Sequence, residues 1–241
     1  MHVAGRGLAI TGRQRELLAA LLLRPNAIVS GGELVEDVWP DSHAAGLGHR
    51  LHTCVGRLRK SLAPDAAERI VTREPGYLLL VEPGELDAER FDALCAECGD
   101  AACCQDWRRV LDASDAALSL WRGEPLLDIA VLPGRGDAAS YYNEQLLHVL
   151  EHRMDALIGL RRYAEAAAYL DKLVRRHPLR ERFTAQRMTA LSLDGRRAEA
   201  LLVYRSARRS LVDTLGIEPG VDVKLLHQLI LEGSLTASSV S

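Results

Sequence analysis

A repeat of 34 residues in the second half of the chain constrains its fold more than any other feature. The pair Ala156-Leu157 recurs as Ala190-Leu191, and the segment 162–166 (RYAEA) recurs as 196–200 (RRAEA) at the same offset. Alanines at equivalent positions allow consecutive helices to approach each other closely. The sequence therefore predicts that this half of the chain is a stack of paired helices.

Seven helices are expected between residues 85 and 233. Apolar periodicity places them at 87–98, 102–121, 138–159, 163–176, 180–193, 196–213 and 221–231. A 34-residue period in paired helices is the tetratricopeptide spacing, and such arrays bind other protein segments on a concave face more often than they catalyse reactions. The last stretch, 234–241, is small and polar, and we predict that it is a flexible tail.

Composition favours helices, and the length suffices for one large or two ordinary domains. The chain has 241 residues, of which 48% are hydrophobic and only 5% aromatic, so leucine and alanine supply most of the apolar content. No apolar run reaches the roughly 18 residues of a membrane span. The N-terminus lacks the basic start and long apolar stretch of a signal peptide. We therefore expect a cytoplasmic protein with no membrane partner.

Residues 1–84 differ from the rest because they mix helix patterns with strand patterns. Thr11–Gln14 and Ser30–Glu33 have the form of capping boxes, and each opens a helix that ends near a proline. In a third helix, one stripe carries Leu47, Leu51, Val55, Leu58 and Leu62. Residues 69–81 then predict a β-hairpin, in which Pro75 fixes φ and Gly76 is free to take a positive φ.

Positive charge is concentrated on the third helix. Residues 1–82 hold ten Lys or Arg and nine Asp or Glu, and the remainder holds twenty and twenty-four, so net charge alone does not indicate a polyanion partner. Residues 49–60, however, contain four full positive charges and no acid. With the leucine stripe facing inward, the outer side carries Thr53, Arg57 and Lys60, with His49 and Arg50 near them and His52 and Arg59 at the flanks.

Such a helix matches the requirements of a DNA groove, since arginine bonds guanine O6 and N7 and lysine meets phosphates. A charge run alone is more often a solvated face. Here, the helix is the third of three and precedes a hairpin with Arg73 near its tip, which is the layout of a winged helix-turn-helix. The predicted fold is mainly α, with a winged helix-turn-helix and its β-hairpin wing at 1–84 and an all-α tetratricopeptide-like domain at 85–233.

The run RLRKSL at 57–62, followed by IVTREPGYLL at 70–79, resembles the OmpR-type winged-helix domain of the SARP family, whose members regulate antibiotic biosynthesis gene clusters. The second half is similar to the family's bacterial transcriptional activation domain at 86–94, 118–129, 177–191, 195–220 and 226–231. The resemblance implies an activator that binds direct repeats near the −35 region, as a homodimer on DNA, and contacts RNA polymerase including its sigma factor.

The resemblance also assigns residues. Thr53, Arg57, Arg59 and Lys60 match recognition-helix positions, and Arg73 with Gly76-Tyr77 matches the wing. The predicted DNA contacts are His49, Arg50, His52, Thr53, Arg57, Arg59, Lys60, Arg73 and Tyr77. Family members usually carry Gln, Tyr and Ser where this chain has His52, Cys54 and Gly56, so the sequence preference is expected to differ. They also have a further strand or two before Gly7–Ile10, which leaves either a start assigned late or an incomplete N-terminal sheet.

Residues 148–152 (HVLEH) have the H-x-x-E-H spacing of one class of zinc peptidase. On the helix expected there, the apolar stripe carries Leu146, Leu147, Leu150, Met154 and Leu157. That stripe places His148, Glu151, His152 and Asp155 on the outer face, which offers neither a third protein ligand nor a dry cleft. A solvated face is therefore the preferred interpretation, and a metal hydrolase is the minor alternative.

Four of the five cysteines lie close together at positions 95, 98, 103 and 104. They have the ligand types of a Cys₄ zinc site or a redox sensor. Cys95 and Cys98, however, fall in a helix that packs through Phe91 and Leu94, and Cys103 and Cys104 are expected to begin the next helix. We favour packing within a helix hairpin, because free cysteine behaves as a small apolar residue.

No other motif indicates catalysis. The chain lacks G-x-x-x-x-G-K-[ST] and G-x-S-x-G, and Trp121 and Tyr204 are assigned to the core. The sequence therefore predicts a protein that is not an enzyme and has no metal and no cofactor. The alternative to a DNA-binding activator is a tetratricopeptide-like adaptor, whose basic helix would bind acidic protein partners without sequence-specific DNA binding.

Overall fold

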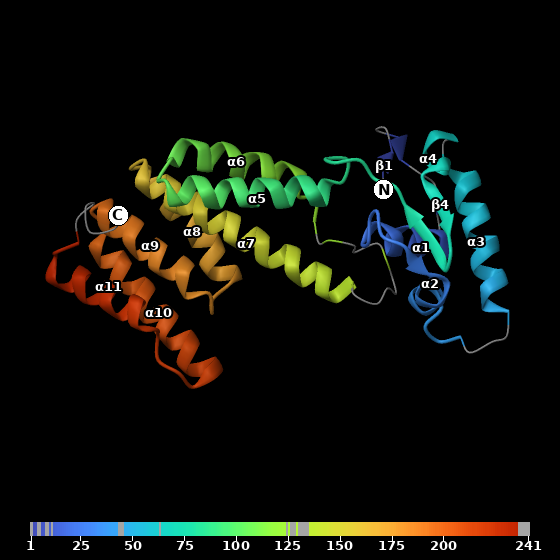
Figure 1. Cartoon of the computed structure of the whole chain (residues 1–241). Coiled ribbons are helices and arrows are strands. Elements are labelled where there is room, and N and C mark those ends of the chain that lie inside the picture. The colour runs from blue at the N-terminus through green and yellow to red at the C-terminus, as the bar shows by residue number, and fades with distance from the viewer. Residues whose placement is uncertain are drawn as a thin grey trace. The chain divides into compact units, whose positions relative to one another are not determined.

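The computed structural model describes residues 2–3, 6–7, 10, 12–42, 46–62, 64–123, 125, 129 and 135–235 (Figure 1). The chain forms two compact units, Met1–Arg90 with Arg122–Glu144, and Phe91–Trp121 with Gln145–Ser241. The structure is 71% helix, which confirms the mainly α class. The division between residues 84 and 85 stays a prediction, and most of the proposed tail lies outside the described residues.

The first unit contains the three predicted helices, α1 (Arg13–Leu22), α2 (Gly31–Val38) and α3 (Leu47–Ser61), and a short helix, α4 (Pro64–Glu68), that was not predicted. The hairpin strands are β4 (Ile70–Arg73) and β5 (Gly76–Leu79). A two-residue strand, β3 (Val29–Ser30), pairs with β5, so the antiparallel sheet has the order β3-β5-β4. Before α1, β1 (His2–Val3) and β2 (Arg6–Gly7) form a separate antiparallel pair.

The second capping box is confirmed and the first is not. At the start of α2, the backbone N–H of Glu33 donates to Ser30 Oγ (3.2 Å) and that of Ser30 donates to the Glu33 carboxylate (2.9 Å). These bonds hold the pKa of Glu33 below its usual value, because they favour the ionised carboxylate. Thr11 lies outside the described residues, and α1 begins with Gly12, which has no side chain, at the cap position.

The leucine stripe of α3 faces the core as predicted. Leu51, Val55, Leu58 and Leu62 are buried, whereas Leu47 at the start of the helix is half-buried. They pack with α1 and with buried side chains of the sheet, including Ile70 and Leu79. Because one side of α3 is committed to this core, its opposite side faces solvent along the whole helix.

Gly76 lies in the hairpin as predicted, but the predicted reason for a glycine there, a positive φ, was wrong. Gly76 does not have a positive φ, unlike seven other glycines of the described chain. A Cβ at this position would instead lie 1.9 Å from the carbonyl oxygen of Val29, on the neighbouring strand β3. Glycine is required here because two backbones approach too closely for any side chain.

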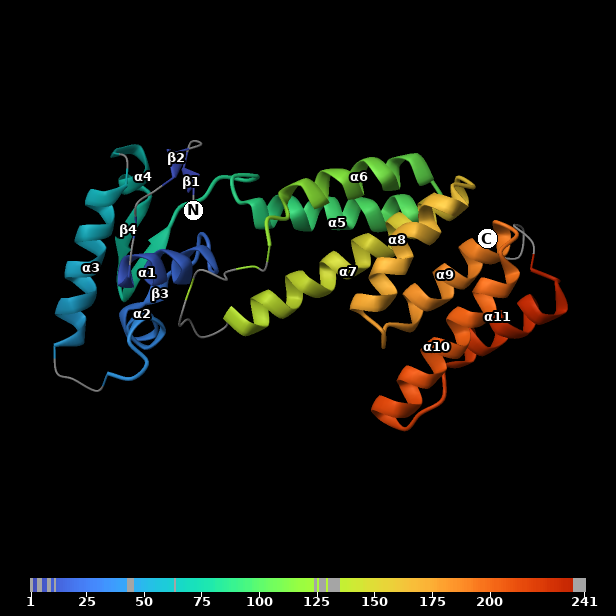
Figure 2. The same ribbon diagram turned by 180° about the vertical axis from the view of Figure 1, so that it is seen from behind.

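All seven helices predicted after residue 85 are present. They are α5 (Asp87–Cys103), α6 (Trp107–Leu120), α7 (Arg135–Gly159), α8 (Tyr163–Arg176), α9 (Glu181–Leu193), α10 (Arg197–Leu215) and α11 (Val221–Glu232). In Figures 1 and 2, α5 and α6 lie side by side in both views, and α10 and α11 do so as well. The main error concerns α5, which continues to Cys103 rather than ending near residue 98.

The 34-residue repeat corresponds to a repeated turn between paired helices. Arg161 (φ 59°) and Gly195 (φ 80°) occupy equivalent positions. In each turn, the next residue donates its N–H to a carbonyl five residues earlier, Arg162 to Leu157 and Arg196 to Leu191, both at 2.8 Å. Between α5 and α6, Gln105 (φ 55°) and the bond from Asp106 to Ala101 (2.9 Å) repeat the same geometry. The second unit is therefore a stack of helix hairpins.

Candidate nucleic-acid interface

The solvent-facing side of α3 carries most of the predicted contact residues. His49, Arg50, His52, Arg57 and Lys60 are exposed, and Thr53 and Arg59 are half-buried. α3 contains no acidic residue, and its last turn carries Arg59 and Lys60. Cations in the last turn of a helix are favoured by the partial negative charge of its C-terminus. The helix therefore tolerates this density of positive charge without internal neutralisation.

Four cations of α3 and the hairpin are not neutralised by any residue in the described part of the chain. Among the residues that the structure describes, no hydrogen bond or ion pair engages the side chain of Arg50, Arg57, Lys60 or Arg73. Elsewhere in the same unit, Arg13 pairs with Glu16, and Arg24 pairs with the buried carboxylate of Asp37. Arg50, Arg57, Lys60 and Arg73 are therefore available to a polyanion on α3 and the hairpin.

A concavity of about 510 Å³ opens beside α3. Its walls come from the start of α1, the end of α2 and the exposed side of α3, and the lining residues are Arg13, Gln14, Trp39, His49, Arg50, Thr53, Cys54 and Arg57. Arg13, Gln14 and Trp39 were not predicted as site residues. No local sequence signal distinguishes them, because only the packing of α1 and α2 brings them beside α3.

Two of these additional residues also fix the wall in place. Arg13 Nη1 donates to the Val38 carbonyl (2.7 Å) and to Glu16 (2.7 Å), which ties the start of α1 to the end of α2. Gln14 Oε1 accepts from Ser61 Oγ at the end of α3 (3.1 Å). The helices around the concavity are therefore linked by side chains as well as by the apolar core.

Thr53 lies inside the concavity with its hydroxyl partly engaged. Thr53 Oγ1 donates to the His49 carbonyl one turn earlier (2.9 Å). This bond uses the hydroxyl proton, so the oxygen lone pairs and the methyl group remain for contacts with base edges or a thymine methyl.

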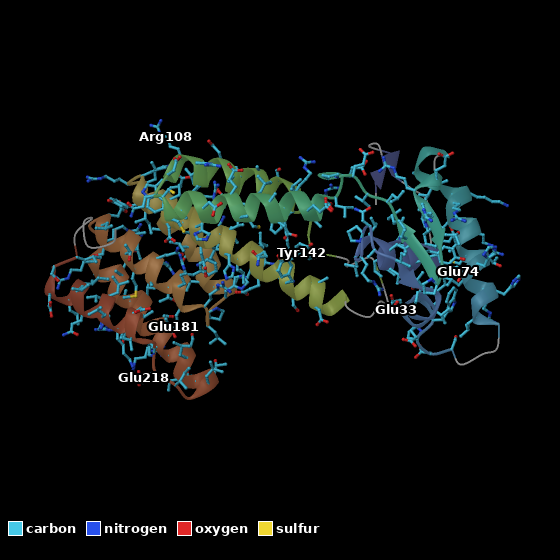
Figure 3. The ribbon with its side chains drawn as sticks, in the orientation of Figure 1. Glu33, Glu74, Arg108, Tyr142, Glu181 and Glu218 are labelled. Atoms are coloured by element: carbon cyan, nitrogen blue, oxygen red, sulfur yellow. The ribbon has the colours of Figure 1, made fainter. Side chains whose placement is uncertain are left out.

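Two hairpin residues have different surroundings. Arg73, the last residue of β4, is exposed, and Glu74 follows it at the tip of the hairpin (Figure 3). Tyr77 is only 8% exposed and belongs to the core. Its hydroxyl lies 3.3 Å from His52 Nδ1. Arg73 is therefore available to an external partner, whereas Tyr77 is not, and we do not retain Tyr77 as a DNA contact.

Arg59 is also engaged within the unit. Its Nε and Nη2 both donate to the carbonyl of Ile70 (3.1 and 2.6 Å), and Nη2 also donates to Thr72 Oγ1 (3.1 Å). Arg59 is thus the one predicted cation of α3 whose guanidinium is bound to the protein in the described chain.

The predicted outer face of the H-x-x-E-H segment is only partly confirmed, because His148 is exposed, His152 and Asp155 are half-buried and Glu151 is buried. Glu151 is buried and accepts from Arg180 Nε (2.6 Å), and Asp155 accepts from Arg182 (2.8 Å) and Gln186 (2.6 Å). The reason is that α7 is covered by its neighbours in a stack, so its polar side packs against α9. Burial, with the charge of Arg182, lowers the pKa of His152. Within the described residues, no three His, Cys, Asp or Glu side chains are grouped as metal ligands.

The cysteines of the second unit are separated by their surroundings. Cys98 is fully buried, and its Sγ lies 3.9 Å from the Val110 carbonyl, whereas Cys103 and Cys104 are exposed. Cys103 ends α5 rather than beginning the next helix, which corrects the prediction. Burial raises the pKa of Cys95 to about 12 and that of Cys98 to about 11, so both thiols stay protonated at neutral pH.

Two aromatic residues assigned to the core have ring partners. The rings of Phe91 and Trp121 lie 5.5 Å apart, and Tyr204 stacks on His227 at 3.7 Å. Both Trp121 and Tyr204 are half-buried. None of the described helices combines the length and apolar character needed to cross a membrane.

Comparison with known proteins agrees with this architecture. Residues 5–79 match the family model of the transcriptional regulatory protein C-terminal domain, and residues 86–231 match that of the bacterial transcriptional activator domain. The chain is 32% identical over 234 residues to regulatory protein DnrI of Streptomyces peucetius, covering 92% of this chain and 85% of DnrI. The chain belongs to the SARP family of transcriptional regulators. Both family models describe regulators rather than enzymes.

Other SARP relatives are longer than this chain. Transcriptional regulator RedD of Streptomyces coelicolor is 34% identical, with 91% of this chain and 64% of RedD covered. Regulatory protein AfsR of Streptomyces griseus is also 34% identical, but the present chain spans only 22% of the length of AfsR. A solved structure of Mycobacterium tuberculosis EmbR, in complex with a low affinity phosphopeptide, has a TM-score of 0.87 and 29% identity, covering 95% of this chain and 62% of EmbR.

Proposed function

We propose that this SARP protein is a sequence-specific DNA-binding transcriptional activator, with α3 in the major groove and the β4–β5 hairpin over the adjacent backbone or minor groove. The observation that carries the proposal is the surface formed by Arg50, Arg57, Lys60 and Arg73. These cations are exposed and have no acidic partner among the described residues. Phosphates supply the missing negative charge at a density that few protein surfaces match.

Each residue has a distinct role in this proposal. Arg57 and Thr53 line the concavity beside α3 and contact base edges, with Arg57 suited to guanine O6 and N7. Arg50, Lys60 and Arg73 meet phosphates, and His49 lies beside them. Each phosphate contact contributes about 0.9 to the slope of log affinity against log salt concentration. Binding is therefore expected to weaken steeply as salt rises.

The targets and partners follow from the family. The similarity to DnrI, RedD and AfsR supports a role in switching on an antibiotic biosynthesis gene cluster. The SARP resemblance supports binding to direct repeats near the −35 region, as a homodimer on DNA. It also supports contact between the second unit and RNA polymerase, including its sigma factor, because stacked helix hairpins commonly bind protein segments.

Footprinting across the intergenic regions near its own gene tests the proposal. Arg57→Ala is expected to weaken cognate binding by about 1–3 kcal/mol and to relax base selectivity at one position. Arg205→Ala is the matched control, because Arg205 is an exposed arginine on α10 of the second unit. An equal loss on cognate and random DNA would remove Arg57 from base recognition.

The same experiment separates the activator from the adaptor. An adaptor that uses α3 for acidic proteins would show no sequence preference at any salt concentration, whereas an activator keeps its preference as total affinity falls.

A further inference from the structure

We propose that Arg59 and His52 are positioning residues that hold the β4–β5 hairpin (the wing) in a fixed position against α3, the recognition helix. We call this attachment the lock. Because of it, the helix and the wing bind DNA as one rigid unit. This inference rests on the proposed function for its purpose, but the lock itself is a property of the free protein. In this proposal, the Arg59 guanidinium binds the wing and not a DNA phosphate.

The pairing of the hairpin shows which backbone groups need a partner. β4 is an edge strand, and its register places Ile70 opposite Leu79 and Thr72 opposite Tyr77. The N–H of Leu80 donates to the Arg69 carbonyl (2.9 Å), so Arg69 and Leu80 face each other through hydrogen bonds. Bonded and non-bonded pairs alternate in an antiparallel ladder. The carbonyl of Ile70 therefore points away from β5, toward the free edge.

Arg59 occupies that free edge. Two of its nitrogens converge on the Ile70 carbonyl, and Nη2 also reaches Thr72 Oγ1. Figures 1 and 2 show α3 alongside β4 in both views. A planar guanidinium is able to make such a forked contact, whereas a lysine ammonium is not. Hydrogen bonds from charged donors are roughly twice as strong as neutral ones.

His52 makes the second attachment, to the other strand. His52 and Arg59 are seven residues, or about two helical turns, apart, so they lie on the same side of α3. Their partners, Tyr77 and Thr72, face each other directly across the hairpin. α3 therefore holds both members of one cross-strand pair.

The position of this lock along the hairpin explains how it aids DNA recognition. The next cross-strand pair toward the tip is Arg73 opposite Gly76. Arg73, which we propose meets phosphate, is thus one residue beyond the attachment, while Arg57 on α3 lies two residues before Arg59. Fixing this spacing in advance reduces the ordering cost of binding and allows only one separation of the two contacts.

Two single-charge deletions in the same turn of α3 test the lock. Arg59→Met is expected to speed amide hydrogen exchange in β4 of the free protein by about tenfold, because charge-assisted bonds are lost. On DNA, it should lose hydroxyl-radical protection at the wing flank while protection under α3 remains. Lys60→Met should leave exchange in β4 unchanged and lower the salt slope by about 0.9.

Arg59→Lys keeps the positive charge and serves as a control for a folding defect in Arg59→Met. The lock predicts faster β4 exchange and loss of wing-flank protection in this variant as well, because a lysine ammonium does not make the forked contact. The proposal is overturned if β4 exchange stays unchanged in both Arg59 variants, and also if Arg59→Met reduces the salt slope as Lys60→Met does while the wing footprint persists. Loss of DNA selectivity in the original protein would instead count against the proposed function, because the exchange data are collected without DNA.

Discussion

Arginines serve opposite purposes on α3 and between α7 and α9. On α3 and its hairpin, Arg50, Arg57 and Arg73 have no acidic partner among the described residues. Between α7 and α9, Arg180 binds buried Glu151, and Arg182 binds Asp155. The first set leaves positive charge available to a partner, whereas the second set joins two helices of the same chain.

This difference shows why net charge is a poor guide to function here. Residues 1–82 have a net charge of +1 and residues 83–241 of −4, and Arg and Lys are about equally frequent in the two segments, ten in 82 residues and twenty in 159. Most of those described in the helical stack are neutralised by nearby acids, such as Arg208 by Glu218 (2.5 Å; Glu218 is labelled in Figure 3). The surface of α3 is distinguished by unpaired cations that lie together on a helix without acidic residues, rather than by their number.

The largest effect is expected where the hairpin meets β3. Gly76→Ala places a Cβ against the Val29 carbonyl, so β3 and β5 must separate. We expect a loss of about 3 kcal/mol or more in the free energy of unfolding, measured by urea denaturation. Faster exchange in β5 should accompany it. A stable variant with unchanged exchange would show that the sheet does not hold the wing.

Glu151→Ala tests the ion pairs between α7 and α9. It leaves Arg180 without its carboxylate, and we expect a loss of about 2–3 kcal/mol in stability, below the cost of breaking a fully buried pair. Arg57→Ala, by contrast, should change stability by no more than about 0.5 kcal/mol, because the Arg57 side chain has no hydrogen bond or ion pair with any described residue. Equal destabilisation by both substitutions would erase the distinction between the two sets of arginines.

Gly56→Ala should stabilise the protein. Gly56 lies inside α3, and a Cβ there has no heavy atom within 4 Å. Alanine in a helix interior is favoured over glycine by about 0.5–1 kcal/mol. A rise in thermal midpoint checks this, and it serves as the control for Gly76→Ala. A fall would mean that α3 needs the flexibility of glycine.

The smallest effect is expected at the hairpin tip. Glu74 is exposed beside Arg73 and repels phosphates that Arg73 attracts. Glu74→Gln should tighten DNA binding by about 0.2–1 kcal/mol at low salt, with the gain vanishing at high salt. Fluorescence anisotropy at two salt concentrations measures both values. A gain that does not depend on salt would have another cause.

Several features were predictable because their causes are local in the sequence. The Ser30–Glu33 capping box involves residues three apart, and the leucine stripe of α3 follows from helical periodicity. The repeated turns after α7 and α9 follow from a fixed period. The cationic side of α3 also follows, because burying one stripe of a helix exposes the opposite one.

The remaining features depend on residues far apart in the chain, which periodicity does not locate. Periodicity gave α7 one apolar stripe, yet the stack covers more of this helix, so Glu151 is buried under Arg180. The β3 strand is two residues long, and its pairing with β5 is what makes glycine necessary at position 76. Sequence alone thus determined which helices form and where cations concentrate. Tertiary structure decided which of those cations are bound internally, because a charged side chain acts on a partner only when folding leaves it unpaired.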